Sequence, residues 1–210
     1  VIFPRFHQLD VIRKVLYDVM TNKSSQNYLL QHSAGSGKTN EIAWLSYRLA
    51  SLHDADNKII FDSIIICTDR VVVDRQLQQA VLSLEHKSGF IRVMDEKCTS
   101  ADLGRALEGN TKIVVTTIQK FPYIVGNVKA LKDKHFAVII DEAHSSTGGK
   151  NMKAVSDVLR ECEEIDVEDI LTKEVSKNGK PENVSVFAFT ATPKPTTLKL
   201  FGRTNTNGRN

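Results

Sequence analysis

The start of the chain carries apolar residues spaced three and four positions apart, which predicts a helix with one buried face. This stripe consists of Leu9, Ile12, Leu16 and Val19. The same spacing predicts helices in the stretches 42–49, 73–84 and 152–162. A further helix is expected between Ser100, which can cap its start, and Gly109, which can close it.

Short runs of apolar and β-branched residues alternate with these helices and are predicted as strands. They are residues 28–30, 63–67, 90–93, 112–115, 136–140 and 185–189. Parallel strands need crossover connections and lie buried on both faces, so near-continuous apolar strands separated by helices indicate a mostly parallel sheet. The expected fold class is therefore α/β, a doubly wound sheet with helices on both faces.

The length of 210 residues suits one sizeable α/β domain and leaves a second, small domain possible. Residues 163–183 break the alternation with an acidic run followed by Lys177–Pro181, and we expect an exposed insertion or hairpin there. The domain is expected over residues 1–202, and residues 203–210 would be a polar tail or truncated linker. Because Val1 is not an initiator methionine, the sequence looks like a piece of a longer protein.

Composition excludes several classes of protein without identifying a partner. The net charge of +3, from 28 basic and 25 acidic residues, is too small to indicate a polyanionic ligand by itself. Cys67, Cys98 and Cys162 lie far apart and have no metal-ligand spacing. No apolar run approaches the length of about 18 residues that spans a bilayer, and no signal peptide opens the chain. We therefore expect no membrane contact and a cytoplasmic location.

The strongest motif is a glycine-rich loop between a predicted strand and a predicted helix. Its nucleotide-binding residues are predicted to be Ser33, Ala34, Gly35, Ser36, Gly37, Lys38 and Thr39. Glycines let the backbone N–H groups point inward at phosphate oxygens, and the helix start adds a partial positive charge. Lys38 should reach the β- and γ-phosphates of ATP, and the Thr39 hydroxyl should coordinate Mg²⁺. His32 stands where the usual pattern begins with glycine, a departure that the intact remainder of the motif makes tolerable.

A second motif is a pair of carboxylates, Asp141 and Glu142, at the end of an apolar strand. Because the carboxyl ends of parallel strands lie at one edge of a sheet, Asp141 should emerge beside the phosphate loop. It would hold Mg²⁺, directly or through water. Glu142 would position and deprotonate the attacking water, which favours hydrolysis over binding alone. The predicted catalytic residues are thus Glu142, Lys38 and Asp141.

Asp141-Glu142-Ala143-His144, followed by Thr190-Ala191-Thr192-Pro193, resembles the signature of superfamily 2 helicases and translocases. Within that superfamily the chain looks most like the first RecA-like motor domain of the restriction subunit of type I restriction enzymes. The further segments that carry this resemblance are Gln31–Thr39, Thr68–Arg70, Val73–Leu77, Val115–Phe121, Asp141–Ser145 and Phe201–Gly202.

The resemblance implies roles for residues outside the phosphate site. Thr190 and Thr192 would transmit the nucleotide state, with His144 linking them to the acidic motif. Gln8 would contact adenine, the alternative being a solvated residue in the first turn of a helix. The residues expected to bind the DNA backbone are Arg70, Arg75, Thr116 and Thr117. Equally open is that these four are solvated helix starts, with Arg70 paired to Asp74 on the surface.

The implied function is to couple Mg-ATP hydrolysis to translocation along double-stranded DNA, before cleavage by a nuclease domain that this sequence lacks. The implied partners are the modification and specificity subunits of a type I restriction complex, and a second RecA-like domain in the intact chain. Such a domain would contribute an arginine finger, worth about 10³- to 10⁵-fold in rate. The isolated chain is therefore expected to bind ATP weakly and hydrolyse it poorly.

Two other functions remain open. A DNA or RNA helicase of the same superfamily would share every phosphate-handling residue named above. A nucleotide-dependent scaffold that binds ATP without hydrolysis is the other, and Glu142 argues against it because a scaffold needs no water-activating carboxylate.

Overall fold

A computed structural model of the chain describes residues 3–22, 26–33, 35–68, 75–85, 87–95, 97–141 and 182–191. The predicted helix over residues 152–162, most of the predicted insertion and the polar tail lie outside this described part. Within it, no helix is long and apolar enough to cross a membrane.

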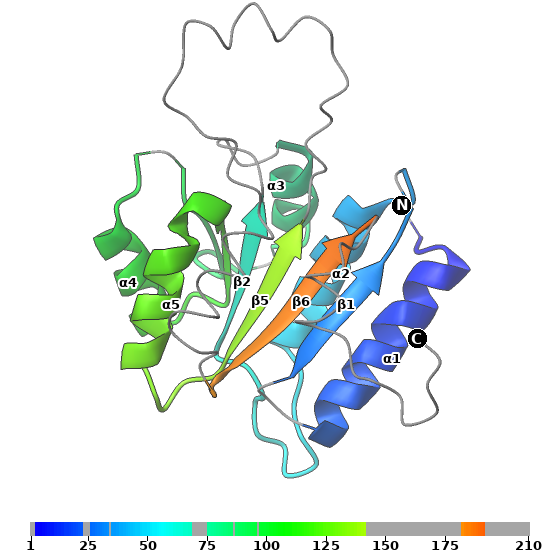
Figure 1. The fold of residues 1–210 in the computed structure, drawn as a ribbon, viewed down its shortest axis with the longest axis horizontal. Helices are drawn as coiled ribbons and strands as arrows, with labels where there is room; N and C mark the ends of the chain where they lie inside the picture. The colour runs from blue at the N-terminus through cyan, green and yellow to red at the C-terminus, as the bar shows by residue number, and fades with distance from the viewer. Residues whose placement is uncertain are drawn as a thin grey trace, which may run out of the picture.

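The core element is a six-stranded sheet in the order β1-β6-β5-β2-β4-β3, and its strand pairings are parallel. Figure 1 shows β1, β6, β5 and β2 side by side in this order. The strands are β1 Asn27–Gln31, β2 Ser63–Thr68, β3 Ile91–Val93, β4 Ile113–Thr117, β5 Phe136–Asp141 and β6 Val184–Thr190. Each predicted strand is confirmed, with ends that differ by no more than two residues. The predicted α/β class with a parallel sheet is also confirmed.

Helices cover both faces of the sheet, as predicted. They are α1 Phe6–Asn22, α2 Lys38–Ala50, α3 Arg75–Leu82, α4 Ser100–Glu108 and α5 Phe121–Ala130, with a short 3-10 turn, η1 Ile118–Lys120, before α5. Buried side chains of α1, α2 and α3 pack in one hydrophobic cluster with the sheet, and those of α4 and α5 pack in a second cluster. Figure 1 shows α4 and α5 together on one side and α1 on the other.

The central strand β2 shows how the sequence produces these two clusters. All six of its residues are buried, and successive side chains of a strand point to opposite faces. Ile64 and Ile66 therefore join the cluster of α1, α2 and α3, while Ile65 and Cys67 join that of α4 and α5. A continuous apolar run is what a strand buried on both faces requires.

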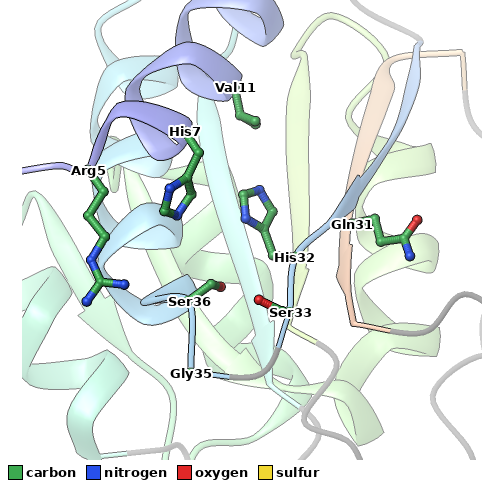
Figure 2. A pocket seen from close by; sticks show the side chains of 8 residues that line it. All are labelled: Arg5, His7, Val11, Gln31, His32, Ser33, Gly35 and Ser36. Atoms are coloured by element: carbon green, nitrogen blue, oxygen red, sulfur yellow. The ribbon is translucent and has the colours of Figure 1, made fainter.

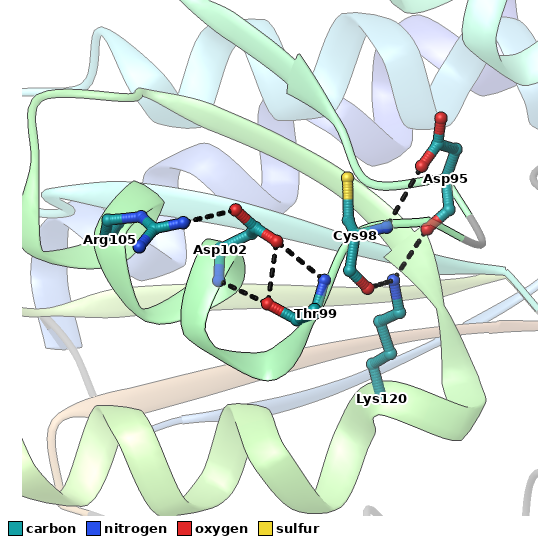
Figure 3. A network of polar contacts seen from close by, with 6 residues as sticks. All are labelled: Asp95, Cys98, Thr99, Asp102, Arg105 and Lys120. Carbon is teal, nitrogen blue, oxygen red and sulfur yellow. Dashed lines mark hydrogen bonds and ion pairs between the residues drawn. The ribbon is translucent and has the colours of Figure 1, made fainter.

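One helix prediction needs correction, and one helix was missed. Ser100 does not cap α4: the cap is Thr99, whose hydroxyl accepts from the Asp102 backbone N–H while the Asp102 carboxylate accepts from that of Thr99 (Figure 3). Gly109 closes the helix as expected, since its N–H donates to the Arg105 carbonyl. Helix α5 was not predicted, although Pro122 suits the first turn of a helix.

Candidate nucleotide-binding site

Three neighbouring strands bring distant parts of the sequence to one edge of the sheet. β1, β6 and β5 are adjacent and parallel, so their carboxyl ends meet at the same edge (Figure 1). β1 leads into the phosphate loop, β6 ends at Thr190, and β5 ends at Asp141. In the strand register, Gln31 lies opposite Thr190 and Asp141 lies opposite Phe189. The loop, Thr190 and Asp141 therefore share one edge of the molecule.

The phosphate loop has the backbone that its glycines predict. Gly35 and Gly37 adopt positive φ values of 75° and 89°, the left-handed region that residues with a Cβ rarely adopt. Gly37 precedes α2, which begins at Lys38 and Thr39. The first N–H groups of a helix have no partner within the helix and face outward at its start. Lys38 and Thr39 are thus at the N-terminal end of α2, which is the end of a helix that binds anions.

Gln8 on α1 is bonded to this loop rather than solvated. Its side chain is 3% exposed, and its Nε2 donates to the carbonyls of Ser36 at 3.1 Å and Gly37 at 3.2 Å. Its Oε1 accepts from the Arg5 backbone N–H at 2.8 Å. A Cβ at position 37 would lie 2.7 Å from the Gln8 Nε2. Gln8 therefore fastens α1 to the phosphate loop, and its contact with adenine stays a prediction.

A pocket of about 500 Å³ opens between the start of α1 and the loop (Figure 2). Arg5 and His7 line it from the α1 side, and His32, Ser33 and Ser36 line it from the loop side. The rings of His7 and His32 lie beside each other, with centroids 6.0 Å apart. Nitrogen donors and hydroxyls on the wall of a concave site suit a polar, anionic ligand.

His32 and Glu41 form a buried pair beneath the loop that the sequence analysis missed. The His32 Nε2 lies 3.2 Å from the Glu41 Oε1, and the two side chains are 7% and 0% exposed. Burial raises the pKa of Glu41 to about 7. Burial, followed by the charges of His7 and Lys38, lowers the pKa of His32. The sequence contained one sign of the buried carboxyl group. Glu41 stands four residues before Leu45, so both side chains lie on the same, buried face of α2.

The remaining described residues are placed as follows. Asp141 is half-buried at the end of β5. Thr190 is 2% exposed, and within the described part of the chain its hydroxyl has no hydrogen-bond partner. Arg75 is exposed at the start of α3, which is compatible with a contact to DNA. Thr116 is 0% exposed and Thr117 is 8% exposed. Because the side chain of Thr116 is fully buried, its position does not favour the predicted contact with DNA.

The other predicted site residues lie outside the described part of the chain. They are Ala34, Arg70, Glu142, His144 and Thr192. Their predicted roles in phosphate binding, DNA contact, water activation and coupling therefore stay predictions. Among the described residues, no group of three or more His, Cys, Asp or Glu side chains could hold a metal ion by itself.

Comparison with known proteins identifies a family of ATPases. The model of a family described as SWI2/SNF2 ATPase matches residues 7–206 of the chain. No sequence match is found among curated proteins.

Several solved structures have the same fold at low sequence identity. The helicase domain of Hef from Pyrococcus furiosus has a TM-score of 0.56 and 15% identity, over 95% of this chain and 36% of that chain. A DEAD box protein from Methanococcus jannaschii has a TM-score of 0.54 and 23% identity, over 92% and 45%. A nuclease-deletion mutant of the type ISP restriction-modification enzyme LlaGI, in complex with a DNA substrate mimic, has a TM-score of 0.53 and 16% identity, over 90% and 17%.

These likenesses confirm the predicted RecA-like fold. The chain spans less than half the length of each of these three proteins.

Proposed function

The chain belongs to the SWI2/SNF2 ATPase family and is a helicase-like motor domain of superfamily 2, and from this we propose that it binds Mg-ATP at the phosphate loop and uses ATP hydrolysis to move along double-stranded DNA. The observation that carries the proposal is the shared edge of β1, β6 and β5. It assembles the loop, Thr190 and Asp141 from segments far apart in the sequence.

The residues at this edge fit a magnesium-bound triphosphate. The left-handed glycines 35 and 37 turn the loop at the start of α2, and a Cβ at position 37 would collide with Gln8. Lys38 would bind the β- and γ-phosphates. Thr39 and Asp141 offer the oxygen ligands that Mg²⁺ prefers, and the metal would neutralise the charge that develops on the transferred phosphoryl group.

Glu142, which follows Asp141 directly, would orient the attacking water and accept its proton. This role distinguishes the proposed motor from a scaffold that binds ATP without hydrolysing it. Thr190 and Thr192 would pass the state of the nucleotide to the DNA-binding residues, for which we propose Arg70, Arg75 and Thr117.

Within the motor proteins, we propose a place in the restriction subunit of a type I restriction enzyme. The motifs around Gln31–Thr39 and Asp141–Ser145 support it, and so does the fold shared with the type ISP enzyme LlaGI. The modification and specificity subunits and a second RecA-like domain would then be the partners. A helicase is the second candidate, because Hef and the DEAD box protein share the fold equally well.

ATP hydrolysis by the full-length protein, measured with duplex DNA, single-stranded DNA and RNA in turn, tests the proposal. We expect duplex DNA to stimulate turnover most. Stimulation by RNA or single strands alone would favour the helicase, and no stimulation by any of them would contradict a motor function.

Glu142→Gln tests hydrolysis separately from binding. The variant should retain ATP binding and lose turnover by about 10²-fold or more, whereas Glu108→Gln, at the exposed end of α4, should leave both unchanged. Unchanged turnover in Glu142→Gln would remove that residue from the mechanism.

A further inference from the structure

His32 is the last residue before the phosphate loop, and its side chain contacts the helix that follows the loop. Its Nε2 lies 3.2 Å from the Oε1 of Glu41, which stands three residues after Lys38, in the first turn of α2. The contact therefore spans the loop from one end to the other. A cross-connection at the two ends of a flexible segment reduces the number of conformations that the segment can adopt.

Among the described residues, His32 is the polar group that lies beside the Glu41 carboxyl group. Glu41 is fully buried, and none of the described residues makes a well-aligned hydrogen bond to either of its oxygens. A buried carboxyl group without a partner is strongly destabilising, so the fold gains by keeping the His32 ring beside it. The burial of Glu41 therefore favours a fold in which the His32 ring stays beside it.

His32 also joins the loop to β6 and faces α1. Its backbone N–H donates to the Thr190 carbonyl at 2.9 Å. Its ring centroid lies 6.3 Å from that of Phe189 on β6. The ring of His7 on α1, which Figure 2 shows beside it, has its centroid 6.0 Å away. One residue therefore contacts the helix after the loop, the strand that ends in Thr190 and the start of α1.

We propose that His32 is a positioning residue that, through Glu41, holds the phosphate loop in its triphosphate-binding conformation before the nucleotide arrives. The inference rests on the proposed function, since it concerns ATP binding at that loop. Gly35 and Gly37 give the loop the left-handed turns it needs, but glycine also loses more conformational freedom on ordering than any other residue. A tether that orders the loop in advance removes part of the ordering cost from the binding step.

His32→Phe in the full-length protein tests the proposal, because phenylalanine keeps the ring that packs on Phe189 and removes the nitrogen that contacts Glu41. The KM for Mg-ATP should rise about tenfold, the size of a typical coupling between side chains in contact. The kcat should change much less, because the loop is ordered once the nucleotide is bound. His53→Phe, in the exposed loop after α2, is the matched control and should change neither constant.

Two further variants separate positioning from a purely structural role. His32→Gln keeps a side-chain N–H donor and should restore most of the affinity for Mg-ATP. The double variant His32→Phe/Glu41→Leu removes both polar groups and should recover the resistance to denaturant that His32→Phe loses, because no unpaired carboxyl group remains buried. Its KM for Mg-ATP should nevertheless stay raised, since the tether is absent.

The outcomes also distinguish this inference from the function on which it rests. If the wild-type protein does not bind Mg-ATP, the proposed function itself fails. If the wild type binds and His32→Phe has the same KM, the positioning role is wrong while the function stands. If the double variant recovers both its stability and its KM for Mg-ATP, the pair is only a structural contact and the positioning role is wrong.

Discussion

Of the two glycines described in the phosphate loop, Gly37 has less room for a side chain than Gly35. Gly35 and Gly37 both have left-handed φ angles, so alanine at either should destabilise the fold by about 1–2 kcal/mol. At position 37 a Cβ would also lie 2.7 Å from the Gln8 Nε2, whereas at position 35 nothing lies within 4 Å. Denaturant unfolding and Mg-ATP titration should both show a larger loss for Gly37→Ala than for Gly35→Ala.

Equal losses for the two variants would contradict the contact between Gln8 and the loop. A further check is Gln8→Ala introduced into Gly37→Ala. Removing the amide relieves the collision but not the backbone strain, so Gly37→Ala should cost about as much unfolding free energy in the Gln8→Ala background as Gly35→Ala costs in the wild type.

The buried carboxyl group of Glu41 predicts a pH dependence of stability. Its pKa in the folded protein is raised from 4.5 to about 7, so the folded state binds this proton more tightly than the unfolded state. The resulting contribution to stability is full below pH 4.5 and is lost as the pH rises through about 7. Its upper size is about 3 kcal/mol. Urea unfolding of the wild type and of Glu41→Gln from about pH 5 to about pH 8 measures it.

The difference between the two curves is the informative quantity. The lowered pKa of His32 has the opposite effect, because its contribution is present above pH 6.5 and is lost as the pH falls. Both proteins carry His32, so this effect largely cancels in the difference. We expect the wild type to lose stability relative to Glu41→Gln as the pH rises, and a difference independent of pH would contradict the burial of Glu41.

At the residue scale, the sequence predicts what depends on local backbone chemistry. The glycines of the loop, Lys38 and Thr39 follow from the motif because a phosphate loop needs those residue types in that order. The pair of His32 and Glu41 does not follow from any motif. It depends on how the loop folds back between strand and helix, and so does the use of the Gln8 amide on the loop carbonyls.

At the scale of the elements, α4 tests whether capping or intrinsic helix propensity fixes the start of a helix. Thr99 and Asp102 satisfy each other's backbone N–H groups, and Arg105 adds a contact of 2.6 Å to the Asp102 carboxylate (Figure 3). The hydrogen bonds from Thr99, then Arg105, lower the pKa of the Asp102 carboxyl group. Thr99→Ala should therefore lower the unfolding free energy by about 1 kcal/mol.

Ser100→Ala is the matched control for the cap. Ser100 is the first residue inside the helix, where alanine is the better helix former, so the unfolding free energy should stay within about 0.5 kcal/mol of the wild type. Chemical denaturation of both variants decides the point. A larger loss for Ser100→Ala than for Thr99→Ala would restore the cap that the sequence alone suggested.

The strands could be predicted better than the helices. A buried parallel strand needs a continuous apolar run, and such runs are conspicuous in the segments 63–67 and 136–140. Helix α5 was missed because its stability comes from packing: Ile124, Val125 and Val128 are buried against the sheet, while Gly126 weakens the local preference for a helix. Tertiary contacts therefore outweigh propensity in this segment.

At the scale of the whole molecule, the sequence predicted that the motifs would meet but not how. Strand direction sufficed to place Asp141 and Thr190 at the edge of the phosphate loop, because parallel strands end on the same side. The order of the strands depends on non-local pairing that no local pattern encodes. The structure inserts β6 between β1 and β5, which puts Thr190 directly between the loop and the acidic motif.

The central claim is that this edge binds one magnesium-bound triphosphate, and calorimetric titration of the full-length protein with Mg-ATP tests it most directly. The wild type should bind one equivalent, and Lys38→Ala should bind about 30-fold more weakly or worse, the effect of losing a hydrogen bond to a charged group. Lys58→Ala, in the exposed loop before β2, should bind as the wild type does. Binding of Mg-ATP by Lys38→Ala with unchanged affinity would contradict the account.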